Sequence, residues 1–93
     1  VTQRLVATPS ALDALPSALD ALASAGIMGT ALFVRHIAGD WGGLCAKDKE
    51  SNQLALATGV RILSAYTLPT KQRIWEITEA DRSVTTLLRP DEY

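Results

Sequence analysis

A chain of 93 residues holds one folded domain and is too short for two hydrophobic cores. Its composition, 47% hydrophobic and 20% charged, is typical of a globular protein and excludes a disordered tail. The formal net charge of −1 gives no broad attraction to phosphates, which disfavours nucleic acid as a partner.

The lone cysteine, Cys45, has no partner for an internal disulfide, which favours a reducing compartment such as the cytoplasm. No apolar run approaches the roughly 18 residues that span a bilayer. The first residues also lack the charged start and long apolar core of a secretory signal. We therefore expect a single cytoplasmic domain over residues 1–93, with no membrane segment.

The first expected element is a short strand at residues 4–8, "RLVAT". Thr8 and Pro9 follow as a typical helix start. The predicted helix contains a tandem copy, with "PSALDAL" at residues 9–15 and again at residues 16–22. A proline inside a helix costs roughly 3 kcal/mol, so we expect a kink or a break at the second copy's proline.

The repeat places its leucines three or four positions apart, on one side of a helix. Two interpretations of this row remain open. It is either a stripe that binds a partner protein, or the face of an ordinary helix packed on the protein's own sheet. The leucines concerned are Leu12, Leu15, Leu19 and Leu22.

Two further helices are predicted before the pattern changes. The first covers residues 30–38, "TALFVRHIA", with Thr30 as its N-cap and Gly39 at its end. The second covers "KDKESNQLALAT", with Gly59 just past its end. Its first residues mix both signs of charge, which is typical of a solvated helix surface.

The last third of the chain alternates between apolar and polar residues. Three β-rich runs at residues 60–68, 73–78 and 83–89 are joined by short polar turns, which predicts an antiparallel meander. The element order is then β-α-α-α-β-β-β. We predict an α+β fold in which the helices pack on one face of the sheet and the first strand is free to lie at an edge.

The stretch "RHIAGDWGGLC" at residues 35–45 concentrates polar side chains around the single histidine. His36 and Asp40 are four positions apart and share a helix face if the last turn continues through Gly39. A carboxylate that orients an imidazole makes a general acid/base pair. The alternative is structural, with Asp40 capping the following turn and His36 half-buried beside Ile37.

A second polar stretch, "TEADRSVTT" at residues 78–86, lies at the last hairpin. If this hairpin folds beside the end of the second helix, Arg82 and Thr85 join His36 and Asp40 in one catalytic cleft. Arg82 would there stabilise developing negative charge. The same residues are also ordinary turn and exposed-strand chemistry.

No cofactor motif is present, and one histidine with one cysteine does not make a zinc site, so we expect neither cofactor nor metal. Trp41 is followed by two glycines, which would leave its ring accessible as an anchor for a partner protein. The first hypothesis is therefore a non-catalytic protein that acts by docking on another protein. The alternative is a small metal-independent nuclease-like or other hydrolase that uses His36 as general acid/base.

Three blocks carry a resemblance to a known family: "HIAGDWGGLCAKDKESN", "RILSAY" and "IWEITEADRSVTTLLRPDEY". Over residues 6–93 the chain resembles small bacterial proteins met on plasmids and other mobile elements, some called "plasmid-related protein". That family has no settled activity, so the resemblance implies a setting and no mechanism. Two departures are the doubled heptad and Glu76, where the family tends to have an apolar residue. A buried carboxyl at Glu76 would be costly.

Overall fold

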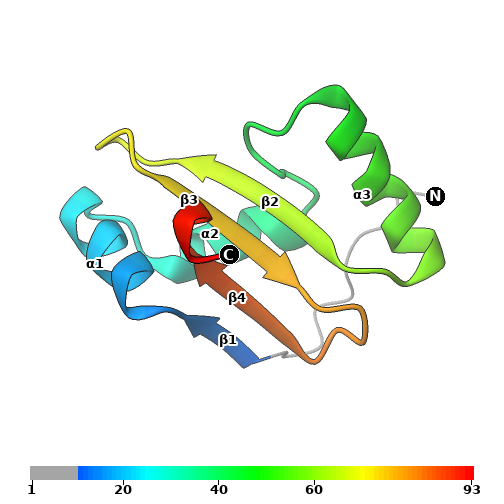
Figure 1. Cartoon of the computed structure of the whole chain (residues 1–93), viewed down its shortest axis with the longest axis horizontal. Helices are drawn as coiled ribbons and strands as arrows, with labels where there is room; N and C mark the ends of the chain where they lie inside the picture. Colours follow the sequence, from blue (N-terminus) through cyan, green and yellow to red (C-terminus); the bar gives the residue numbers. More distant parts are fainter. Residues whose placement is uncertain (1–10) are drawn as a thin grey trace.

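Three α-helices and a four-stranded sheet form the regular structure of residues 11–93, the part of the chain that the computed structural model describes (Figure 1). The predicted α+β class is confirmed. The predicted strand at residues 4–8 lies outside the described residues. The elements are β1 (Ala11–Ala14), α1 (Pro16–Ala25), α2 (Gly29–Ile37), α3 (Ala46–Thr58), β2 (Ile62–Thr67), β3 (Arg73–Thr78), β4 (Val84–Leu88) and a 3-10 turn, η1 (Pro90–Glu92).

The sheet has the order β1-β4-β3-β2. The consecutive strands β2, β3 and β4 pair antiparallel, as the meander prediction requires. At the edge, however, β1 runs parallel to β4, with Ala11 opposite Val84 and Ala14 opposite Leu87. The expectation of a purely antiparallel sheet is therefore wrong, because the edge strand β1 runs in the same direction as its neighbour β4.

The tandem repeat folds in two different ways. The first copy forms β1 in its described part, whereas the second copy begins α1 at Pro16. The predicted helix is therefore wrong for residues 11–14, while the expected break at Pro16 is confirmed. Pro16 has no N–H to donate, and its ring keeps the preceding Leu15 extended, at φ −69° and ψ 151°. Pairing with β4 then favours a strand over a helix in the first copy.

The leucines of the repeat do not share one side. Leu22 is buried and Leu12 is half-buried against the same core cluster, but Leu19 is 54% exposed. The buried side of α1 is formed by Ala18, Ala21 and Leu22. Packing of the helix on the protein's own core is thus confirmed, but mainly through alanines rather than through the leucine row.

The other helix ends are close to their predicted positions. α2 begins at Gly29 with Met28 as N-cap and no side-chain cap, so the expected cap by Thr30 is wrong. Gly59 ends α3 in the left-handed conformation, at φ 79°, as predicted.

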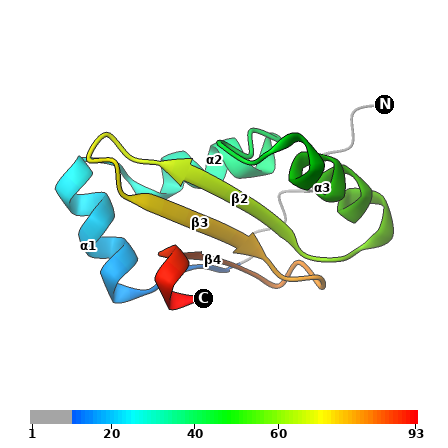
Figure 2. The ribbon, with the colours of Figure 1, turned by 45° about the horizontal axis from the view of Figure 1, so that its top comes forward.

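α2 and η1 lie on opposite sides of the sheet, and α1 lies at one end of it (Figures 1 and 2). α2 covers the face that is turned away in Figure 1, α3 lies beside the edge formed by β2, and η1 rests on the face toward the viewer. The main core cluster fills the space between α1, α2 and the sheet, and a second cluster lies around Ile62 beneath α3. The main cluster consists of Ala18, Ala21, Leu22, Leu32, Tyr66, Leu68, Ile74 and Leu87.

The loop after α2 lies along the free edge of β2. The Ala65 N–H donates to the Trp41 carbonyl at 3.1 Å, and the Gly43 N–H donates to the Ala65 carbonyl at 2.7 Å. Gly42 has φ 73°, and a Cβ there would lie 2.1 Å from the Ala65 oxygen. Only glycine fits this close approach.

No single helix within residues 11–93 is long and apolar enough to cross a membrane. The pair α1 and α2 reaches the required length and composition only together, with a bend of 99° between them.

Candidate functional site

His36 lies at the centre of a hydrogen-bonded network between α2 and the sheet. Its Nδ1 is 2.5 Å from the Ser64 hydroxyl on β2, and its Nε2 is 2.7 Å from the Thr78 hydroxyl on β3. The Thr78 hydroxyl is in turn 2.8 Å from that of Thr85 on β4. The structure thus connects two of the predicted site residues, His36 and Thr85, through Thr78.

The His36 imidazole is closed to solvent. The residue is only 1% exposed, not half-buried as the structural alternative assumed. Burial lowers the pKa of His36 to about 4, so the ring is neutral at pH 7. Both ring nitrogens are occupied by hydroxyl groups, so neither is free to exchange a proton with a substrate. This geometry fixes α2 on the sheet.

Glu76 is the unexpected member of this region. It lies between Ser64 on β2 and Leu87 on β4, is fully buried, and has no hydrogen bond from any described residue to either carboxyl oxygen. Burial raises the pKa of Glu76 to about 8, so the carboxyl is mainly protonated at pH 7. We call His36, Ser64, Glu76, Thr78 and Thr85 the buried polar cluster.

Asp40 does not orient His36. Its carboxylate accepts hydrogen bonds from Arg35, at 2.6 Å from Nε and 3.2 Å from Nη2, and from the Gly42 N–H at 3.3 Å. The hydrogen bond from Arg35 lowers the pKa of Asp40. α2 ends at Ile37, before the turn that would align positions 36 and 40, so Asp40 lies on the exposed surface and caps the following turn.

Arg82 holds the end of α3. Its Nη1 donates to the Val60 carbonyl at 2.8 Å, and its Nη2 donates to the Ala55 carbonyl at 3.2 Å. These contacts satisfy backbone oxygens at and just after the helix end. The guanidinium is therefore used in the fold, although the prediction gave it a catalytic role.

Removal of this cap gives a testable loss of stability. Arg82→Ala should lower the free energy of unfolding by about 1–3 kcal/mol, because a charged donor to the carbonyls of Ala55 and Val60, and more weakly to those of Glu79 and Ala80, is lost. Arg82→Lys should lose less. Chemical denaturation followed by circular dichroism measures the change, with the exposed Lys47→Ala as control. An Arg82→Ala protein as stable as the wild type would show that the cap contributes nothing.

Trp41 is buried rather than accessible. It is 7% exposed and packs with Ala55 and Ile62 in the second core cluster. The glycines that follow it let the loop lie against β2 instead of exposing the ring. The prediction of Trp41 as a partner-binding anchor is therefore wrong in its premise of an accessible ring.

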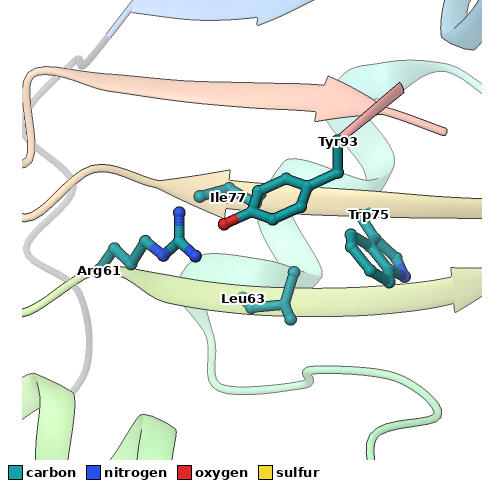
Figure 3. Close-up of a pocket in the computed structure, with 5 residues that line it drawn as sticks. All are labelled: Arg61, Leu63, Trp75, Ile77 and Tyr93. Carbon is teal, nitrogen blue, oxygen red and sulfur yellow. The ribbon is translucent and has the colours of Figure 1, made fainter. Parts of the chain in front are cut away.

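An accessible aromatic site exists on the opposite face of the sheet (Figure 3). Leu63 and Ile77, paired across β2 and β3, form its floor. The Trp75 ring meets the Tyr93 ring edge-on, with centroids 5.6 Å apart. The Arg61 guanidinium lies 5.1 Å from the centre of the Tyr93 ring. We call this hollow, of about 190 Å³, the sheet-face pocket.

The alternation of residues along β2 and β3 predicts part of the lining of the sheet-face pocket. Alternation assigns Leu63, Trp75 and Ile77 to one face, but it does not say which face the helices cover. The sequence does not identify the hydroxyl partners of His36, because serine and threonine are also common on exposed strands.

Comparisons with known proteins find no matching family model, no matching curated protein and no matching solved structure.

Proposed function

We propose that the protein is a non-catalytic binding module that docks a partner protein on the face of its sheet that carries η1 and the sheet-face pocket. The observation that carries this proposal is the sheet-face pocket, where half-buried Leu63 of the edge strand β2 and buried Ile77 of β3 form an apolar floor beside Trp75 and Tyr93. Aromatic residues in a pocket are typical anchors of protein interfaces. The docking function is the one that the sequence favoured, with the anchor moved from Trp41 to Trp75.

The size of the pocket supports a protein segment as the ligand. Sites for drug-sized molecules enclose about 300–1,000 Å³, whereas this pocket holds about 190 Å³. It therefore suits one apolar or aromatic side chain. A partner segment would cover the surrounding strand residues and add area to this single anchor.

The hydrolase alternative receives less support. General acid/base catalysis requires a proton-transfer group within reach of substrate. His36 is buried, neutral and bonded at both nitrogens, while Asp40 and Arg82 are engaged elsewhere. The mobile-element and cytoplasmic setting belongs to the same proposal and rests on the sequence resemblance and the lone cysteine.

A charge placed in the pocket tests the docking function. Leu63→Asp should weaken capture of a partner from an extract of the source cells by roughly tenfold or more, because a hydrated carboxylate would replace part of the apolar floor and would lose its water when the partner docks. The matched control is Leu54→Asp, on the exposed side of α3, where the side chain is 61% exposed.

Tyr93→Ala provides a second variant, since this residue is 60% exposed and its loss should leave the fold intact. Circular dichroism establishes folding for each variant. Capture that is equally strong with Leu63→Asp and Leu54→Asp would overturn docking on the sheet face.

A further inference from the structure

Arg61 differs from the arginines that the fold already uses. Arg35 and Arg89 have ion pairs with Asp40 and Asp91. Within residues 11–93, no carboxylate lies within 4.0 Å of the Arg61 guanidinium. Arg61 instead extends toward Tyr93 at the rim of the sheet-face pocket (Figure 3). The rim thus carries a positive charge that the described fold does not neutralise.

We propose that the sheet-face pocket recognises a short protein segment in which an apolar side chain is followed by an acidic one. The apolar group enters over Leu63 and Ile77 beside Trp75, and the neighbouring carboxylate pairs with Arg61. This inference rests on the proposed docking function and names the chemistry of the partner.

The geometry of Arg61 suits a carboxylate. A guanidinium that stacks on an aromatic ring keeps its N–H groups free around its edge, where they form paired hydrogen bonds with a carboxylate. Arg61 is already exposed, so pairing removes little water from it. A partner segment with a basic residue at this position would be repelled by the positive charge of Arg61.

The test uses two blocked peptides that differ in one residue, acetyl-Gly-Phe-Glu-Gly-amide and acetyl-Gly-Phe-Lys-Gly-amide. Each is titrated into the ¹⁵N-labelled full chain, and the Trp75 indole N–H signal reports on the pocket. The acidic peptide should bind roughly three- to tenfold more tightly than the basic one, as expected for one exposed ion pair and one repulsion. The preference should shrink in 1 M salt, where the Debye length is about 3 Å.

Arg61→Glu provides the decisive variant, because it should reverse the preference in favour of the lysine peptide. Arg61→Gln should bind both peptides equally. Arg61 is exposed and directly precedes β2, so these variants should fold, and circular dichroism verifies that.

The outcomes separate this inference from the docking function. Equal binding of both peptides to the wild type, or no shift with either, overturns acidic recognition. The docking function then still stands if Leu63→Asp abolishes capture. Concentration-dependent self-association that Leu63→Asp removes, measured by analytical ultracentrifugation, would identify a second copy as the occupant and also overturn the inference.

Discussion

Glu76→Gln should raise the free energy of unfolding by about 3–5 kcal/mol at pH 9, the largest gain expected from any single change in this protein. Burial raises the pKa of Glu76 to about 8 from 4.5. Above pH 8 the wild-type carboxylate is therefore charged and buried without a hydrogen bond from the described residues. The amide of glutamine has nearly the same shape and never carries that charge.

The sign follows from proton counting. Between pH 4.5 and 8 the folded protein binds the Glu76 proton and the unfolded chain has released it. Stability from this group is therefore full below pH 4.5 and falls as the pH rises to 8. Urea denaturation of the wild type and of Glu76→Gln across this range should give curves that meet near pH 4.5 and separate above it.

Glu79→Gln is the matched control, because Glu79 follows the same strand and is exposed. Its effect should stay within about 0.5 kcal/mol. A wild type and a Glu76→Gln variant with parallel pH profiles would show that folding does not raise the pKa of Glu76, which would overturn this prediction.

Local signals predicted much of the fold. The bounds of β3 and the glycine that ends α3 match because alternation and a left-handed cap are properties of short segments. The first copy of "PSALDAL" was misassigned, because identical residues form a helix after Pro16 and a strand beside β4. That choice depends on a pairing partner about seventy residues away, which no local window contains.

The candidate site was less predictable, for a physical reason. His36, Thr85 and Arg82 were singled out by their chemical types, yet their roles depend on burial and on partners from distant strands. The same types build catalytic sites and satisfied cores. Trp41 was wrongly predicted to be exposed, because two glycines follow it. The same glycines also allow the backbone of this loop to lie close to β2, and there the Trp41 ring is buried.

The two faces of the sheet differ in structure. The buried polar cluster attaches α2 through hydroxyl groups that match both nitrogens of His36. Such a network favours one arrangement of helix on sheet over other packings. The sheet-face pocket lies on the opposite side of the same strands, so a rigid attachment of α2 also keeps Leu63, Trp75 and Ile77 in place.

The stability of the wild type should vary little between pH 4.5 and 6.5, because His36 and Glu76 contribute opposite slopes there. Burial lowers the pKa of His36 to about 4 from 6.5, so the unfolded chain binds the extra proton in this window. Stability from His36 is full above pH 6.5 and is lost as the pH falls to 4. Each slope is about 1.4 kcal/mol per pH unit, so the two cancel.

Replacing either residue alone should reveal the pH dependence of stability that the other residue causes. In Glu76→Gln, stability should rise by about 3 kcal/mol from pH 4 to 6.5, because only the His36 titration remains. In His36→Gln, it should fall with rising pH between 4.5 and 8, because only Glu76 titrates.

The double variant is the control and should show neither slope. Above pH 6.5, loss of the imidazole should also lower stability, by about 1–3 kcal/mol, because Ser64 loses its hydrogen-bond partner while Thr78 keeps the hydroxyl of Thr85. Denaturation curves at half-unit pH steps measure all four proteins. If Glu76→Gln kept a flat profile between pH 4 and 6.5, the imidazole would have to be accessible to protons in the folded state, and its burial beneath α2 would not govern its titration.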